Sequence, residues 1–329
     1  MNILKAGIFL TLFSMTTISV AKMESYQHCR VSDCRLGGSQ LVVSDYSKTQ
    51  YPLVFAHGTS GFSSILGVMD YWHGIPQDLT RNGAQVFITQ EATLNASEVL
   101  GEQLLNQIEV ILAITGQEKV NLIGHSQGVQ SVRYAAAIAP QKVATVTGIA
   151  GPVKGLEIAD AASQAISLPK ANLIFNLVTP VINAVFSVLG MASGAYYSQD
   201  SAVVLDSLNT KGAKAFNAKF PQAVPTTDCG EGQYVVNGVR YYSWTGIGTK
   251  TNVLDISDYI LELAGKLTSG KSDGGVGQCS THLGQVIRDD YNQNHLDEVN
   301  QIFGLVHVLG ANPVALYRQH ANRLKLEGY

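Results

Sequence analysis

Charged residues are scarce in this sequence. They make up 14% of its 329 residues, the net charge at pH 7 is −3, and no run of lysine or arginine occurs. Nucleic-acid-binding domains usually carry a basic patch or stripe, so this composition disfavours a nucleic-acid partner. Hydrophobic residues reach 46%, which allows a sizeable core in one large α/β domain or two small ones.

The sequence also lacks an apolar run long enough to cross a membrane. A spanning helix needs about 20 apolar residues, and the most apolar segment, residues 171–192, is interrupted by Pro180 and Gly190. We therefore predict no stable membrane span. This uncharged segment fits either a helical hairpin in the core or a mobile lid over a lipid-binding cleft, because a helix that is apolar on most sides needs cover.

The first 21 residues have the features of a secretory signal peptide. Lys5 provides a positive start, an apolar stretch follows, and residues 19–21 are small. We expect cleavage after Ala21 rather than a membrane anchor, because Ser14 and two threonines interrupt the apolar part. The mature chain would then be exported to a compartment that permits disulfides.

Cysteine is rare, with four residues at positions 29, 34, 229 and 279. They show no C-x-x-C spacing, which argues against a zinc site. Four cysteines allow three pairings. A local bridge between Cys29 and Cys34 is one possibility, and it would leave Cys229 and Cys279 to close a long loop.

Apolar runs alternate with helical periods over the first half of the chain. Strands are predicted at residues 51–56, 84–89, 120–123 and 143–149, and helices at 71–82, 96–115 and 129–139. This alternation indicates a mostly parallel sheet with helices on both faces, whose reactive groups gather beyond the carboxyl ends of the strands. Residues 234–246 predict a β-hairpin turning at Asn237-Gly238.

The most informative motif is G-x-S-x-G, at residues 124–128 (GHSQG). An apolar strand precedes it and a helix follows, which is the setting of a nucleophile elbow. The two glycines let strand and helix lie close together while Ser126 is held in a strained, accessible conformation. The alternative is a Gly-Ser turn in which Ser126 caps the helix.

A serine nucleophile needs an imidazole base, which follows it along the chain in this type of fold. His295 is preferred because it lies in a polar stretch, and His282 is the second choice. His307 lies in an apolar run and is predicted to be a core residue. His320 lies in a basic terminal helix, which favours a protonated surface position.

The acid that orients the base is predicted to be Asp273, in a glycine-rich loop before His295. Asp255 and Asp258 are alternatives, although either could instead cap a helix. The pair at residues 289–290 is interpreted as a solvated helix face.

Two backbone N–H groups are predicted to bind the oxyanion. One belongs to Gln127, directly after the nucleophile, and the other to Thr59, in the loop after the early strand. The alternative at Thr59 is a plain glycine turn.

Four segments together resemble the secreted triacylglycerol lipases of Gram-negative bacteria, subfamilies I.1 and I.2, with type members from Pseudomonas and Burkholderia. They are residues 51–61 (YPLVFAHGTSG), 124–128 (GHSQG), 241–246 (YYSWTG) and 272–305 (SDGGVGQCSTHLGQVIRDDYNQNHLDEVNQIFGL). The resemblance runs from about residue 51 to the terminal helix 314–325. It is weakest at the N-terminus and in the lid region.

The resemblance implies an α/β-hydrolase fold over residues 22–329, with a helical lid inserted at about 160–200. It implies Ser126, His295 and Asp273 as a catalytic triad, with oxyanion donors at Thr59 and Gln127. The sequence departs from the family at Thr59, where a larger apolar residue is usual, and at Val129, where a third glycine is common.

The resemblance also implies one structural calcium ion. The matching ligands are the carboxylates of Asp255 and Asp297 and the backbone carbonyls of Gln301 and Leu305, a set of hard oxygen donors suited to calcium. From the residues alone, Asp297 could instead stabilise a helix N-terminus.

The same resemblance implies a disulfide between Cys229 and Cys279, whereas the family offers no counterpart for Cys29 and Cys34. It also leads us to expect that a dedicated membrane-anchored foldase assists folding and that the enzyme leaves the periplasm through type II secretion.

The function predicted from these observations is hydrolysis of fatty-acid esters at a lipid interface by an acyl-enzyme mechanism. The alternatives are a carboxylesterase, phospholipase or acyltransferase of the same fold, and a non-catalytic lipid-binding protein.

Overall fold

A computed structural model describes residues 22–59, 64–65, 69–92, 94–167 and 201–329. The predicted signal peptide, residues 1–21, lies outside the described residues. So do residues 168–200, which hold most of the predicted lid.

A nine-stranded sheet forms the centre of the described chain, in the order β11-β10-β8-β7-β3-β6-β1-β2, with β9 paired to β10. Its strands are β1 (Met23–Arg30), β2 (Asp33–Leu41), β3 (Leu53–Ala56), β6 (Val86–Ile88), β7 (Val120–His125), β8 (Val143–Ile149), β9 (Val235–Val236), β10 (Val239–Gly246) and β11 (Gln285–Tyr291). The pairings are parallel except β1 with β2 and β9 with β10. A separate antiparallel pair joins β4 (Ser64–Ile65) to β5 (Met69–Asp70).

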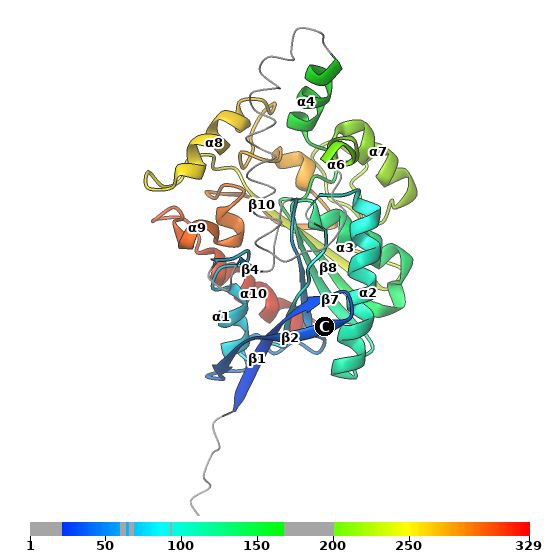
Figure 1. Cartoon of the computed structure of the whole chain (residues 1–329), viewed down its shortest axis with the longest axis vertical. Helices are drawn as coiled ribbons and strands as arrows, with labels where there is room; N and C mark the ends of the chain where they lie inside the picture. The colour runs from blue at the N-terminus through cyan, green and yellow to red at the C-terminus, as the bar shows by residue number, and fades with distance from the viewer. Residues whose placement is uncertain (1–21, 60–63, 66–68, 93, 168–200) are drawn as a thin grey trace, which may run out of the picture.

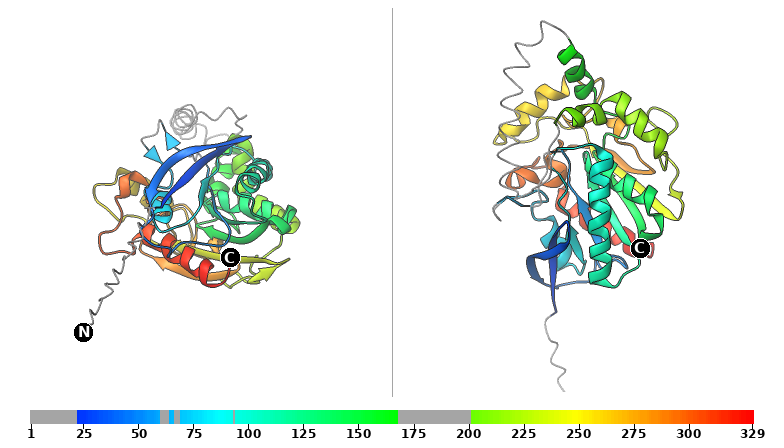
Figure 2. Two further views of the ribbon diagram at one scale, coloured as in Figure 1. Left: turned by 90° about the horizontal axis from the view of Figure 1, so that it is seen from below. Right: turned by 45° about the vertical axis from the view of Figure 1, so that its right-hand side comes forward.

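The α-helices of the described residues cover both faces of this sheet. They are α1 (Ile75–Arg81), α2 (Ser97–Thr115), α3 (Gly128–Ile138), α4 (Glu157–Ser167), α6 (Ser201–Leu208), α7 (Thr210–Lys219), α8 (Ile256–Gly265), α9 (Gln301–Gly304) and α10 (Pro313–Leu326). Helices α2 and α3 lie on one face and α1 and α10 on the other (Figures 1 and 2). Helices α4, α6, α7 and α8 lie above the sheet in the view of Figure 1. The predicted architecture is therefore confirmed.

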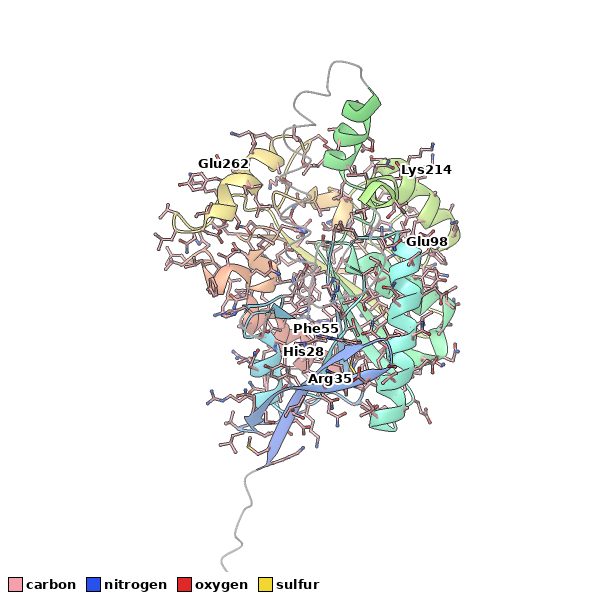
Figure 3. The ribbon with its side chains drawn as sticks, in the orientation of Figure 1. His28, Arg35, Phe55, Glu98, Lys214 and Glu262 are labelled. Carbon is pink, nitrogen blue, oxygen red and sulfur yellow. A yellow bond between two sulfur atoms is a disulfide. The ribbon has the colours of Figure 1, made fainter. Side chains whose placement is uncertain are left out.

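Each face has its own apolar core. Side chains of α2 and α3, such as Leu104 and Val132, pack against Leu122 of the sheet. On the opposite face Phe55 packs with Tyr317 of α10. Figure 3 shows Phe55 inside the molecule, whereas charged side chains such as those of Glu98, Lys214 and Glu262 project from the outer helices.

Most predicted elements are present with shifted ends. The helix predicted at residues 71–82 begins only at Ile75, because Gly74 has a left-handed backbone (φ 72°) and Pro76 fits only the first helical turn. The predicted hairpin is confirmed, with Asn237 and Gly238 both at positive φ as a two-residue turn requires.

The N-terminal hairpin β1–β2 was not predicted. It extends the sheet by pairing β1 with β6, and its turn is closed by a disulfide between Cys29 and Cys34. Polar residues interrupt both strands, and two glycines interrupt β2, so no clear alternation marks them in the sequence. The Cys229–Cys279 disulfide also forms.

The prediction for residues 289–290 is wrong. Asp289 and Asp290 lie in β11, a strand at the sheet edge, and not on a helix. An edge strand tolerates charge because one of its sides is unpaired, which hides it from a search for apolar runs.

Among the described residues, none of the helices combines the length and hydropathy needed to cross a membrane.

Candidate active site

Ser126 lies in the turn between β7 and α3. Its φ of 56° falls in the left-handed region, which a residue with a side chain rarely adopts. The strain predicted for a nucleophile elbow is therefore present.

The two elbow glycines are required by close packing. A Cβ on Gly128 would lie 2.3 Å from the carbonyl oxygen of Ala56, in β3. A Cβ on Gly124 would lie 2.5 Å from the carbonyl oxygen of Gly128. Any side chain here would push α3 away from the sheet and move Ser126 with it.

Val129, at the position where the resemblance led us to expect a third glycine, is accommodated by small residues around it. Its side chain fills the space beside Gly148 and Gly151, where a Cβ would come within 3.0 Å and 2.5 Å of it. The departure in sequence therefore does not displace the elbow.

The structure brings the three predicted triad residues together. The distance from Ser126 Oγ to His295 Nε2 is 2.9 Å, and His295 Nδ1 lies 2.7 Å from Asp273 Oδ2. Asp273 is an acceptor at this distance, so the imidazole proton lies on Nδ1 and leaves Nε2 to accept from the serine hydroxyl.

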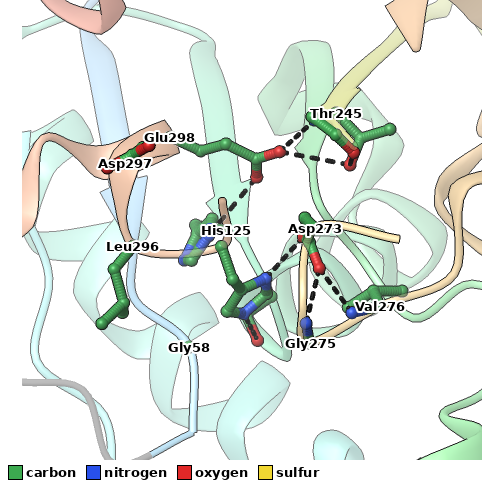
Figure 4. A network of polar contacts seen from close by, with 12 residues as sticks. Gly58, His125, Thr245, Asp273, Gly275, Val276, Leu296, Asp297 and Glu298 are labelled. Atoms are coloured by element: carbon green, nitrogen blue, oxygen red, sulfur yellow. Dashed lines mark hydrogen bonds and ion pairs between the residues drawn. The ribbon is translucent and has the colours of Figure 1, made fainter. Parts of the chain in front are cut away.

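Asp273 is completely buried, and backbone groups satisfy its second oxygen. Oδ1 accepts hydrogen bonds from the N–H groups of Gly275 (2.7 Å) and Val276 (2.6 Å), as Figure 4 shows. Such donors stabilise the charged carboxylate. The same loop fixes the base, because His295 N donates to the Asp273 carbonyl at 2.9 Å.

The two predicted oxyanion donors belong to neighbouring loops. Thr59 follows β3, and Gln127 precedes α3, where the N–H groups of the first turn have no partner within the helix. Their side chains meet, since Thr59 Oγ1 donates to Gln127 Oε1 at 2.6 Å.

His57 orients the peptide that carries the Thr59 N–H. Its Nδ1 donates to the Gly58 carbonyl at 2.9 Å. In a trans peptide the C=O and N–H point in opposite directions, so this bond fixes the direction of the Thr59 N–H.

His57 is held by a buried polar cluster. Its Nε2 accepts from the Glu91 N–H at 3.2 Å and lies 3.5 Å from the Glu91 carboxyl. Burial lowers the pKa of His57 to about 4 and raises the pKa of Glu91 to about 8. Both side chains are therefore neutral at pH 7.

A second polar group lies directly behind the triad. Tyr71 Oη accepts from the Gly58 N–H at 3.1 Å and lies 2.6 Å from His125 Nδ1. The His125 ring is 4.5 Å from the His295 ring, and its Nε2 is 3.8 Å from Glu298 (Figure 4).

Burial determines the charge of His125 and Glu298. Burial lowers the pKa of His125 well below its ordinary value. Burial, together with the negative charge of Asp273, raises the pKa of Glu298 well above its ordinary value. Sequence reasoning assigned no role to these residues. Tyr71, within the helix predicted at residues 71–82, lies before the start of α1 at Ile75.

The other candidate bases lie elsewhere. His282 is bonded to the Gly230 carbonyl and to Asp289. The prediction that His307 is a core residue is wrong, because it is half-buried in a loop whose Val308 and Leu309 are 88% and 91% exposed.

The prediction of a surface position for His320 is also wrong. Its side chain is buried beneath the sheet, where Nε2 meets Thr147 Oγ1 at 2.8 Å, and burial lowers its pKa to about 3. The basic neighbour Arg323 donates to His320 Nδ1 at 3.0 Å, so a basic stretch of sequence does not show that the histidine within it is exposed.

Three buried carboxylates lie in or beside the loop that carries His295, namely those of Asp255, Asp258 and Asp297. Asp258 accepts from the backbone of Thr251 and Asn252 and from the side chain of Asn294. Burial first, and then the negative charges of Asp258 and Asp255, raise the pKa of Asp297 to about 7.

The predicted carbonyl ligands are in the adjoining segment. Gln301 begins α9 and Leu305 follows it. A hydrogen bond of 3.1 Å, from Asn252 Nδ2 to the Val306 carbonyl, connects this segment to the turn before Asp255.

One further group could ligate a metal ion. Ligand atoms of His125, His295 and Glu298 lie within 4.8 Å of one another. Both ring nitrogens of His295 already contact Ser126 and Asp273. An ion bound there would displace one of these contacts.

Comparison with known proteins agrees with this architecture. Residues 51–255 match the family described as the alpha/beta hydrolase fold. With a serine at the elbow and a histidine and an aspartate in line behind it, the chain is an α/β hydrolase.

Relatives of similar sequence identify the branch of this broad family to which the chain belongs. A triacylglycerol lipase of Vibrio cholerae is 49% identical over 284 residues, which cover 86% of this chain and 90% of the relative. A triacylglycerol lipase of Pseudomonas fragi is 38% identical over 301 residues, covering 87% and 100%, and one of Burkholderia plantarii is 36% identical over 317 residues, covering 86% and 88%. The chain belongs to the family of these bacterial triacylglycerol lipases, as its sequence motifs predicted.

Solved structures agree at the level of the fold. A lipase of Bacillus licheniformis in its mature form superposes with a TM-score of 0.55 at 18% identity, covering 84% of this chain and 92% of that one.

Proposed function

We propose that this protein is a secreted lipase that hydrolyses triacylglycerols by a serine acyl-enzyme mechanism. The observation that carries the proposal is the chain of contacts from Ser126 Oγ through His295 to Asp273, at 2.9 Å and 2.7 Å. The names of the relatives supply the substrate class.

In the first half of the reaction, Ser126 Oγ attacks the ester carbonyl carbon while His295 Nε2 takes the hydroxyl proton. Asp273 stabilises the charged imidazole through Nδ1–H. The tetrahedral intermediate then collapses, the C–O bond to the alcohol breaks, and His295 returns its proton to the leaving alcohol oxygen.

In the second half, water attacks the acyl-enzyme and gives its proton to His295. The acid leaves and Ser126 Oγ regains a proton. The N–H groups of Thr59 and Gln127 stabilise the negative oxygen in both halves, and each donor contributes about 3 kcal/mol to transition-state stabilisation.

Exposed apolar side chains support action at a lipid surface. On α8, Ile256, Ile260 and Leu263 recur on one helical face and are 80%, 67% and 67% exposed. This helix packs against the loop of Asp273, where Gly274 meets Leu261. An apolar face of this kind is typical of contact with lipid or with another chain segment.

Stoichiometric labelling by an organophosphonate tests the mechanism. We expect one phosphonyl group per chain, mapped by mass spectrometry to Ser126, and none in Ser126→Ala. Retention of ester hydrolysis by Ser126→Ala would exclude the serine mechanism.

Rates with triacetin or tributyrin below and above the solubility limit separate a lipase from a carboxylesterase. A lipase accelerates when an emulsion forms, whereas a carboxylesterase saturates in solution. Phosphatidylcholine vesicles and an added alcohol acceptor test phospholipase and acyltransferase activity. Wild-type protein that binds lipid but hydrolyses none of these esters would be a lipid-binding protein instead.

We further propose that Asp255 and Asp297, with the carbonyls of Gln301 and Leu305, hold one calcium ion. The residues present fit it, because both carboxylates are 1% exposed and hard oxygen donors are what calcium takes. A bound ion would neutralise this buried charge and tie down the loop that carries His295.

Chelation with EGTA should lower the melting temperature of the purified protein, and added calcium should restore it. Asp255→Asn keeps the helix cap formed with Ser257 but removes the charge, so it should need more calcium for the same stabilisation. Asp33→Asn, on the distant hairpin, is the control. An unchanged melting temperature after chelation would rule out the site.

Export also belongs to this proposal. Residues 1–21 would be removed as a signal peptide, and a dedicated foldase and type II secretion would act on the mature chain in the periplasm. N-terminal sequencing of protein from the medium should begin at Lys22, and recovery of active protein should rise when the foldase of a relative is co-expressed.

A further inference from the structure

We propose that the Thr59 hydroxyl and the Gln127 side-chain amide form a latch that positions the two oxyanion donors relative to each other. The proposal rests on the ester-hydrolase function above and assigns the two side chains a role separate from that of their backbone N–H groups.

The direction of the latch is fixed by its chemistry. Thr59 Oγ1 lies 2.6 Å from Gln127 Oε1. An amide oxygen only accepts, so the hydroxyl must donate. The amide cannot be reversed, because Gln127 Nε2 donates to the Asn95 carbonyl at 2.9 Å.

The latch connects three loops at the carboxyl edge of the sheet. Thr59 follows β3, Asn95 lies between β6 and α2, and Gln127 joins β7 to α3. Loops are the softest parts of a fold. An oxyanion site needs donors on separate loops to be placed to within a fraction of an ångström. A direct hydrogen bond between their side chains reduces the movement of these loops relative to each other.

The latch holds Thr59 itself, next to a peptide that other described contacts already fix. On the preceding side, His57 holds the Gly58 carbonyl and Tyr71 accepts from the Gly58 N–H. These bonds fix the peptide before Thr59. The side-chain bond to the buried Gln127 then fixes Thr59 itself, which is only partly buried.

This arrangement depends on a side chain at position 59 that can donate a hydrogen bond. A large apolar side chain at position 59 could not donate to Gln127. A second role is conceivable for the hydroxyl, since it could turn from Gln127 and donate to the oxyanion directly. The two roles give different results in a double-mutant cycle.

The test compares Thr59→Val, Gln127→Met and the double variant with the wild-type protein. Valine keeps the shape and the backbone N–H of threonine but removes the donor. The readouts are kcat and KM for a soluble p-nitrophenyl ester, the rate constant for phosphonylation of Ser126, and the melting temperature. Gln127→Ala replaces Gln127→Met if the latter does not fold.

We expect Thr59→Val to lower kcat and the phosphonylation rate about tenfold, with KM changed less than about twofold. Thr59→Ser, which keeps the hydroxyl, should recover most of this loss. In the Gln127→Met background, adding Thr59→Val should change kcat less than about twofold, because the latch is already absent.

Thr145→Val is the matched control. It removes a threonine hydroxyl that also donates to a side-chain amide oxygen, that of Asn121, at 3.0 Å between β8 and β7. Its melting temperature should fall while kcat stays at the wild-type value.

Three results would overturn the latch. One is an unchanged kcat in Thr59→Val. Another is the same tenfold loss in the Gln127→Met background, which would assign the hydroxyl to the oxyanion itself. The third is an equal loss of kcat in Thr145→Val, which would make the effect a general consequence of lost stability. If the wild-type protein hydrolyses no ester and Ser126 is not labelled, the proposed function fails instead.

Discussion

At the scale of single residues, burial sets the charge of the polar side chains around the site. His57 and Glu91 are both neutral although they lie 3.5 Å apart. A neutral His57 can donate from Nδ1 to the Gly58 carbonyl while Nε2 accepts from the Glu91 N–H. This tautomer holds the Gly58 carbonyl and thereby fixes the direction of the Thr59 N–H, in the loop after β3 that we call the oxyanion loop.

The pH dependence of stability follows from these two residues. The carboxyl of Glu91 loses its proton near pH 4.5 in the unfolded chain and at about pH 8 in the folded one. Its stabilising contribution is therefore complete below pH 4.5 and is lost as the pH rises to 8. His57 acts in the opposite direction between pH 4 and 6.5. Between pH 6.5 and 8, Asp297, whose pKa is about 7, and Glu298 change stability in the same direction as Glu91. Comparison with a variant that lacks the Glu91 charge therefore separates the contribution of Glu91 in this window.

Glu91→Gln, which is neutral at every pH, should abolish this loss. We expect the free energy of unfolding of the wild type to fall in that window by up to about 1.4 kcal/mol per pH unit more than that of the variant. Urea unfolding at several pH values measures it. Parallel pH profiles for the two proteins would show that Glu91 is ionised in the folded state.

At the scale of elements, the site depends on how closely α3 approaches the sheet. Gly128 contacts the carbonyl oxygens of Ala56 and His57, so the elbow and the oxyanion loop touch through backbone atoms. The same helix is held on its outer side by the buried Arg133, which donates to the Asn217 side chain and the Phe220 carbonyl beyond α7.

Gly128→Ala should therefore damage both stability and catalysis. The added methyl group overlaps backbone that cannot rotate away, and overpacking of this kind costs about 1–3 kcal/mol. Because α3 carries the N–H of Gln127, we also expect kcat to fall while the KM for a soluble ester changes little. A variant with wild-type kcat and melting temperature would show that α3 can shift without moving the oxyanion donors.

At the scale of the whole molecule, two disulfides constrain different lengths of chain. Cys29 and Cys34 are 5 residues apart and close a hairpin, whereas Cys229 and Cys279 are 50 apart and tie the segment after α7 to the loop beyond Asp273. A longer loop loses more conformational entropy when it is closed.

Removing the two disulfides should have unequal effects. In the chain-entropy estimate, the Cys229→Ala/Cys279→Ala variant loses about 4 kcal/mol of unfolding free energy and Cys29→Ala/Cys34→Ala about 2 kcal/mol. Denaturant unfolding of the two variants, with activity as a second readout, measures the difference. A greater loss from the hairpin pair would mean that β1 and β2 stabilise the sheet mainly through that bridge.

The sequence by itself determined the local parts of this protein. Strand β8 occurs where its apolar run predicts it, α2 ends at Thr115 as its period predicts, and the motif at 124–128 forms a strained turn. Each of these depends on residues close together along the chain, where periodicity and glycine geometry act.

Only the tertiary structure decided what depends on residues far apart. His320 is buried although a surface position was predicted, and His307 lies half-buried in a loop although a core position was predicted. The strands β1 and β2 join the sheet, and Tyr71 contacts His125, 54 positions away. Burial and side-chain contact are properties of the packed molecule, and no local pattern encodes which distant surface will cover a given residue. The bond between Thr59 and Gln127 exists for the same reason, since only packing places side chains 68 positions apart within 2.6 Å.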